Sequence, residues 1–168
     1  MVERWRPAYI ALGSNLDSPR EHIVRACQEL AALPGCSHFT PSGWYRSKPV
    51  GPQDQPDYIN AAAGLLTVLQ AAGLLHALQQ IEQAHGRQRE ERWGARTLDL
   101  DLVFMPGVCV SKEALTLPHP AVAQRNFVLQ PLAEICPHVV VDGHLPVAVM
   151  ASHVGTDGLQ RIGDIPWQ

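Results

Sequence analysis

Leucine alternates with polar residues from Thr97 to Val103, in the order Thr-Leu-Asp-Leu-Asp-Leu-Val. This period of two is typical of a strand with one face in a hydrophobic core. We therefore expect the three leucines to face the core, and Asp99 and Asp101 to share the opposite face. Two carboxylates at positions i and i+2 of a strand lie roughly 7 Å apart. Their mutual repulsion favours binding of one or two divalent cations together with oxygen-rich ligands.

The ten residues before this strand, Arg87 to Arg96, contain four arginines and a tryptophan. The planar guanidinium group suits bidentate recognition of phosphate better than the ammonium group of lysine. Taken separately, the arginines or the aspartates could simply be charged side chains on a solvent-exposed surface. Together, the arginines outnumber the two neighbouring carboxylates, so the two segments predict a polyphosphate site. Trp93 is expected either to close over a ligand or to anchor the loop.

The composition restricts the possible classes of protein. The 168 residues are most simply one domain, 1–168, which is long enough to bury a substantial core. No apolar run reaches the roughly 18 residues of a membrane span, and no signal-peptide pattern is present, so we expect a cytoplasmic protein without a membrane partner. The net charge of −3 makes nucleic acid an unexpected partner. The four cysteines lack metal-ligand spacing and are expected to be reduced in apolar surroundings.

Hydrophobic periodicity and turn residues predict a mixed order of elements. The expected helices are 20–33, with Ser18 as N-cap, 74–85 and 126–134. The expected strands are 8–13, 38–46, 58–69, 97–103 and 108–110, with a closing hairpin of 139–141 and 145–149. This order favours an α+β fold, namely a ferredoxin-like α/β/α sandwich with a mainly antiparallel sheet and additional C-terminal elements.

A second pair of residues follows the loop 47–57, which is rich in proline and glycine. Tyr58 and Asn60 lie at i and i+2, so both are expected on one side of a strand. An aromatic ring beside an amide suits a flat heteroaromatic ligand, through stacking and edge recognition, and Phe127 is a candidate for a second stacking face. Neither a P-loop nor a dinucleotide-binding motif is present. Phosphate transfer would therefore depend on the metal and the arginines.

Four segments combine these features: Ala8–Leu16, Gly51–Ala61, Gly86–Asp101 and Leu117–Pro120. With them the chain resembles the 6-hydroxymethyl-7,8-dihydropterin pyrophosphokinases of folate biosynthesis, over about residues 8–150. The stretch Arg-Trp-Gly-Ala-Arg-Thr-Leu-Asp-Leu-Asp is the most specific part of the resemblance. Members of this family transfer the terminal diphosphate of ATP to the pterin hydroxymethyl group and release AMP. They have a ferredoxin-like core and usually act as monomers.

The resemblance implies a role for each matching residue. The residues implied in catalysis are Arg87, Arg96, Asp99 and Asp101, of which the two aspartates would bind two magnesium ions on the phosphates of ATP. The residues implied in pterin binding are Ser47, Val50, Tyr58, Asn60 and Phe127. The residues implied in ATP binding are Glu82, Arg89, Trp93, Arg96, His119 and Arg125.

Three positions, Lys48, Ala114 and Pro120, depart from the residues common in the family, which bears on nucleotide affinity and loop stiffness. Residues 155–168 lie outside the resemblance and have no expected function, and no general base stands out. Two other functions stay open. A phosphohydrolase would use the same aspartates with water, but it would need no ring pocket. A non-catalytic ligand or RNA sensor would tolerate loss of either aspartate.

Overall fold

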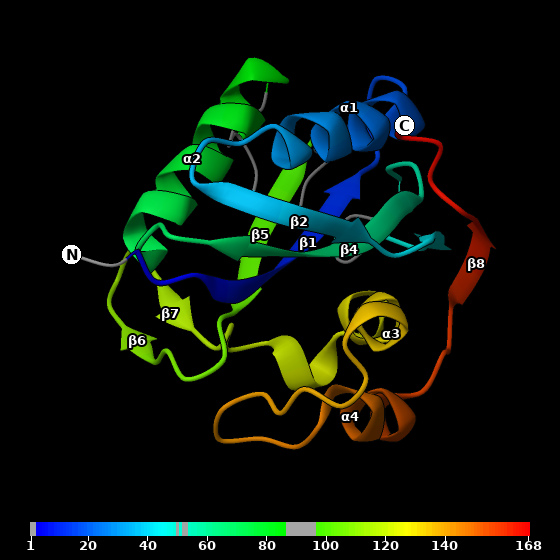
Figure 1. The fold of residues 1–168 in the computed structure, drawn as a ribbon. Helices are drawn as coiled ribbons and strands as arrows, with labels where there is room; N and C mark the ends of the chain where they lie inside the picture. The colour runs from blue at the N-terminus through cyan, green and yellow to red at the C-terminus, as the bar shows by residue number, and fades with distance from the viewer. Residues whose placement is uncertain (1–2, 50, 52–53, 87–96) are drawn as a thin grey trace.

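A single antiparallel sheet forms the centre of the molecule in the computed structural model, which describes residues 3–49, 51, 54–86 and 97–168. Five of its strands run in the order β5-β1-β4-β3-β8, and β2 pairs with β4 next to β3 (Figure 1). The strands are β1 Arg6–Ser14, β2 Cys36–Pro41, β3 Trp44–Ser47, β4 Tyr58–Thr67, β5 Asp99–Phe104 and β8 Leu159–Gly163. The strand β1 therefore lies between β4 and β5.

Helices cover both faces of this sheet (Figure 1). The helices α1 (Pro19–Ala31) and α2 (Ala71–Ala84) pack on one face, against a core that includes the leucines of β5. The helix α3 (Asn126–Ile135) packs on the other face, and α4 (Val147–Val154) packs against α3. Smaller elements, β6 (Val110–Ser111), β7 (Thr116–Leu117) and the 3-10 helix η1 (Val122–Gln124), connect β5 to α3. The predicted α+β class with a mainly antiparallel sheet is confirmed.

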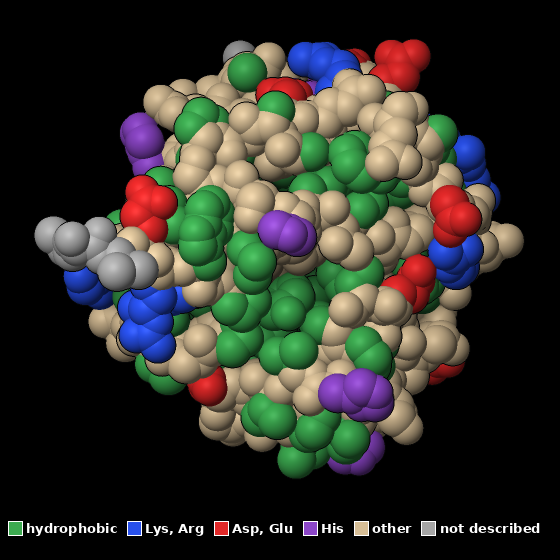
Figure 2. Space-filling view, viewed as in Figure 1, with side chains coloured by type: hydrophobic (Ala, Val, Ile, Leu, Met, Phe, Trp, Pro, Cys, Tyr) green, Lys and Arg blue, Asp and Glu red, His purple; other side chains and the backbone are tan. Residues whose placement is uncertain are grey.

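The surface reflects these layers. In the view of Figure 2, hydrophobic side chains gather in a band across the middle of the molecule, and charged side chains lie mainly toward its edges. Among the described residues, no helix is long and apolar enough to cross a membrane.

The strand that carries the two aspartates has the predicted orientation. Leu98, Leu100 and Leu102 are buried, whereas Asp99 and Asp101 are half-buried on the opposite face. This strand lies at the edge of the sheet, since β1 is its only neighbour among the described strands.

The strand expected over 38–46 is divided into β2 and β3. The break lies at Ser42 and Gly43, where the Ser42 hydroxyl accepts a hydrogen bond from the Ala62 N–H (2.9 Å) and donates one to the Gly43 carbonyl (2.6 Å). A Cβ atom at Gly43 would lie 2.6 Å from the Gly163 carbonyl oxygen and closer still to the Arg161 guanidinium. Close packing against β8 therefore requires glycine at this position.

One local prediction was confirmed in part and another was wrong. Ser18 is the N-cap of α1 and Pro19 begins the helix, as predicted, but Ser18 has φ 66°, in the left-handed region, and its side chain makes no capping hydrogen bond. The predicted closing hairpin is reduced to one bridge, between Val140 and Pro146, and the second predicted strand is the helix α4. Within α4, Val147, Met150 and Ala151 are buried at helical spacing against α3, and this burial favours the helix.

The C-terminal segment, which had no expected role, adds a strand to the sheet. β8 pairs with β3, and its Arg161 donates hydrogen bonds to both carboxylate oxygens of Glu134 on α3. Glu134 also accepts from the Gly43 N–H (3.1 Å) and from the Tyr45 hydroxyl. Burial alone would raise the pKa of Glu134, but the hydrogen bonds from Arg161, Tyr45 and Gly43 outweigh it and lower that pKa. Glu134 thus ties α3 to two strands.

The cysteines only partly follow the prediction. All four are free thiols, and burial raises the pKa of Cys27 and of Cys136 to about 12. Cys109, however, is exposed, and Cys36 is half-buried. The expectation of apolar surroundings for every cysteine was therefore wrong.

Candidate active site at one end of the sheet

The register of three strands brings the two predicted pairs of residues together. Gly13 of β1 lies opposite Asn60 of β4 on one side and opposite Asp99 of β5 on the other. Ala11 likewise lies opposite Asp101. Residues directly opposite one another in antiparallel strands carry their side chains on the same face. The acidic pair and the Tyr58–Asn60 pair therefore share one face of the sheet, separated by β1.

The helix α3 covers part of this same face, and its N-terminal end lies near the acidic pair. Arg125, directly before α3, places a guanidinium nitrogen 3.9 Å from a carboxylate oxygen of Asp101. The same guanidinium lies over the Phe127 ring, 5.7 Å from its centroid. The N-terminal end of α3 thus brings a cation and an aromatic ring to the site.

Neighbouring strands and loops hold Asn60 and Tyr58 in place. Asn60 is buried, and its Nδ2 donates a hydrogen bond to the Ser47 Oγ of β3 at 2.7 Å. Asn15, after β1, donates to the Gln55 side chain and to the Pro56 carbonyl, both at 2.9 Å. These bonds connect the turn after β1 to the loop before Tyr58. The sequence does not predict this contact, because no local pattern links Asn15 to the loop before Tyr58.

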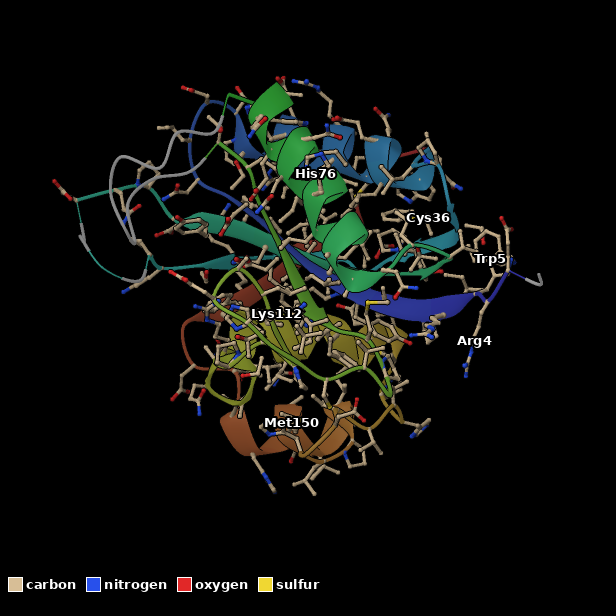
Figure 3. All side chains as sticks on the ribbon, turned by 90° about the vertical axis from the view of Figure 1, so that its left-hand side faces the viewer. Arg4, Trp5, Cys36, His76, Lys112 and Met150 are labelled. Carbon is tan, nitrogen blue, oxygen red and sulfur yellow. The ribbon has the colours of Figure 1, made fainter. Side chains whose placement is uncertain are left out.

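A hollow of about 260 Å³ adjoins the acidic pair on the side of α2. Its lining includes Glu82, Asp101, Ala114, Thr116, His119 and Pro120. Figure 3 views the molecule from this side, with His76 on α2 and Lys112 on the β6–β7 hairpin below it. Two of the three departures from the family pattern, Ala114 and Pro120, therefore lie in this hollow, as does Glu82.

Glu82 contacts β5 around the edge of the sheet. Its carboxylate accepts a hydrogen bond from the Leu100 N–H at 2.9 Å, and the residue is 3% exposed. Leu100 lies between the two aspartates in sequence, so this bond fixes the backbone that carries both of them.

His119 lies between the hollow and Arg125. Its Nδ1 accepts a hydrogen bond from the Ala121 N–H at 3.1 Å, which places the imidazole hydrogen on Nε2. Burial, together with the positive charge of Arg125, lowers the pKa of His119, and Asp99 opposes this effect. The neutral imidazole is therefore a hydrogen-bond donor at neutral pH.

The acidic pair fits magnesium better than a metal held by protein ligands alone. Within the described ranges, no three or more His, Cys, Asp or Glu side chains gather as a metal site. Magnesium is typically bound by one or two carboxylates, with water and substrate phosphates completing the coordination. Asp99 and Asp101 supply two carboxylates, of which Asp101 lines the hollow, and this suits a metal that arrives with a polyphosphate.

Five of the predicted site residues lie outside the described residues, namely Val50, Arg87, Arg89, Trp93 and Arg96. Their roles stay predictions. The other predicted residues, from Ser47 to Phe127, gather at the acidic end of the sheet or line the adjoining hollow.

Fold and site together define a class: α+β proteins with paired aspartates and an aromatic–amide pair at one end of an antiparallel sheet. Residues 9–137 match the model of one such family, 7,8-dihydro-6-hydroxymethylpterin-pyrophosphokinase (HPPK). The chain belongs to this family.

Similar proteins support the assignment. The 2-amino-4-hydroxy-6-hydroxymethyldihydropteridine pyrophosphokinase of Haemophilus influenzae is 47% identical over 134 residues, which cover 80% of this chain and 84% of that protein. The protein of the same name from Pseudomonas aeruginosa is 42% identical over 164 residues, covering 96% of this chain and 98% of the relative.

Solved structures agree at the level of the fold. The crystal structure of wild-type Plasmodium falciparum HPPK-DHPS with pterin and p-hydroxybenzoate matches with a TM-score of 0.73 at 12% identity. The match covers 96% of this chain and 47% of that one, so the chain spans about half the length of that protein.

Proposed function

We propose that this protein transfers a diphosphate group from ATP to the hydroxymethyl group of 6-hydroxymethyl-7,8-dihydropterin and releases AMP, as a step of folate biosynthesis. Membership of the HPPK family supports the reaction. The observation that carries the proposal is the row of Asp99, Gly13 and Asn60 across three strands. This row sets the acidic pair and the Tyr58–Asn60 pair on one face, which supports a polyphosphate site beside a ring site.

The reaction is an in-line displacement. The substrate hydroxyl oxygen attacks the β-phosphorus of ATP and loses its proton to solvent. The bond from that phosphorus to the oxygen bridging the α- and β-phosphates breaks, and AMP leaves with the bonding electrons. Catalysis of this kind rests mainly on positioning and on neutralisation of charge. Asp99 and Asp101 would hold two magnesium ions, and the bound metal would supply the neutralisation.

Other residues orient the two substrates in this proposal. Tyr58 and Phe127 stack on the pterin, and Asn60 reads its edge. Arg125 and the neutral His119 contact phosphate oxygens, and Glu82 keeps the acidic strand in position. Arg87 and Arg96 assist the transfer, as the family resemblance implies. We also propose that the protein acts in the cytoplasm as a monomer.

The test is an assay of purified protein with ATP, magnesium and the dihydropterin. Wild-type protein should form AMP and pterin diphosphate in equal amounts, and only when the pterin is present. Asp99→Ala and Asp101→Ala should abolish AMP formation while retaining part of the pterin affinity. Glu21→Ala, a change at an exposed acid on α1, is the matched control and should keep full activity.

The competing functions predict other products. A phosphohydrolase would release ADP or free phosphate without pterin, and that result would contradict the proposal. A non-catalytic sensor would form no AMP, and its ligand affinity would survive both aspartate substitutions.

A further inference from the structure

Gly13 lies at the centre of the site. Its strand, β1, separates β4, which carries Asn60, from β5, which carries Asp99, and Gly13 is the Cα partner of both. Adjacent strands lie about 4.8 Å apart, so the backbones of Asn60 and Asp99 are roughly 10 Å apart. Consider a heterocycle that hydrogen-bonds to Asn60 and carries a substituent that reaches phosphates held at Asp99. Such a ligand must lie across β1, above Gly13.

The protein itself does not require glycine at this position. A Cβ atom on Gly13 would lie 3.6 Å from Asn60 Oδ1 and 3.7 Å from Tyr58 Cδ1, which is ordinary van der Waals contact. Among the described residues, no other heavy atom beyond its chain neighbours comes within 4 Å, and the backbone has no left-handed φ. Gly43 is different, because a Cβ there would meet backbone at 2.6 Å. Packing and backbone conformation therefore do not explain Gly13.

We propose that Gly13 is a specificity-determining residue, whose missing side chain leaves the space over β1 that the pterin substrate occupies between Asn60 and the acidic pair. The two nearest atoms to a Cβ at this position belong to Asn60 and Tyr58, the residues assigned to the pterin. A methyl group would thus contact both residues of the proposed ring pocket. This inference rests on the proposed function, because it takes the pterin as the occupant of that pocket.

The substitution Gly13→Ala tests the inference. Pterin affinity, measured by fluorescence titration with magnesium and a non-hydrolysable ATP analogue, should fall at least about tenfold, and kcat should fall as well, since small displacements of a reacting group are costly. The affinity for the ATP analogue should change by less than about twofold, because the acidic pair on β5 is unchanged. The melting temperature should be equal or slightly higher, since alanine restricts the unfolded chain.

Gly73→Ala is the matched control, because Gly73 is exposed on α2 and a Cβ there meets nothing within 4 Å among the described residues. It should keep wild-type pterin affinity and rate. Wild-type pterin affinity and kcat in Gly13→Ala would overturn the inference and leave the proposed function standing. A large fall in the melting temperature of Gly13→Ala would also overturn it, because packing would then explain the glycine. Failure of the wild-type protein to form AMP would instead refute the proposed function.

Discussion

Replacing Glu82 with alanine is expected to loosen the strand that carries both aspartates. The Glu82 carboxylate is buried and accepts the Leu100 N–H at 2.9 Å. Because β5 is an edge strand, this N–H has no further strand among the described residues to bond on its outer side. The substitution Glu82→Ala therefore removes the acceptor and leaves a backbone donor unpaired at the centre of the acidic pair.

The magnitude follows from the type of bond. A hydrogen bond to a charged group contributes about 1.5–3 kcal/mol, and an unpaired buried donor costs a similar amount. These two estimates describe the same lost bond, so Glu82→Ala should lower the free energy of unfolding by about 2–3 kcal/mol. Glu82→Gln retains the shape and one acceptor oxygen, and should cost only about 1 kcal/mol.

Two measurements test this reasoning. Urea unfolding at neutral pH gives the free energy, and amide hydrogen exchange at Leu100 reports the local bond. Glu82→Ala should also lower kcat at saturating substrates, because Asp99 and Asp101 lose their fixed backbone. Gln80→Ala, at an exposed position of α2, is the control. A loss of stability below about 0.5 kcal/mol, with unchanged exchange at Leu100, would refute the argument.

Two further substitutions test the supports of the site. Glu134→Gln should cost about 1–2 kcal/mol at pH 7, discounted for a partly exposed ion pair. Since the folded Glu134 carboxyl has a lowered pKa, this stabilisation is complete above the unfolded pKa of about 4.3 and is lost as the pH falls through the folded pKa. The difference in unfolding free energy between wild type and Glu134→Gln, measured in urea, should therefore be smaller at pH 3 than at pH 7. A difference that does not change with pH would contradict this reasoning. Ser47→Ala removes the acceptor for the Asn60 amide, so pterin affinity by calorimetry should fall about five- to tenfold with ATP affinity unchanged; an unaltered pterin affinity would count against this role.

Elements with strong local periodicity could be predicted from the sequence. The alternating leucines located β5, and the helical spacing of Ile23, Leu30, Leu74 and Leu78 located α1 and α2 to within a few residues. The buried faces of these elements follow directly from the period of their apolar residues.

Elements that depend on distant partners could not be predicted. Leu159–Gly163 becomes a strand because β3 offers an edge and Glu134 binds Arg161, and neither partner is near in sequence. The segment from Val147 to Val154 is apolar enough for a strand, and only its contact with α3 decides for helix. In both cases the tertiary context overrides a weak local preference.

The candidate site could be predicted only in part, for the same reason. Each pair of residues at i and i+2 could be recognised, because both members lie on one strand. The relation between the pairs depends on the register of β1 with β4 and β5, which no local pattern indicates. The arrival of Arg125 beside Asp101 similarly depends on how α3 packs on the sheet.

The hydrophobic pattern that stabilises the sheet also aligns the site. In β1, Ile10 and Leu12 face the core under α1 and α2, while Ala11 faces α3. A register shift of one residue between β1 and a neighbouring strand would turn the side chains of one strand to the opposite face of the sheet. Its large apolar side chains would then leave the core that they fill. The same shift would put Asn60 and Asp99 on opposite faces. Burial of the core residues therefore enforces the register that places the ring-binding pair beside the acidic pair, and the small residues of β1 leave room on the functional face.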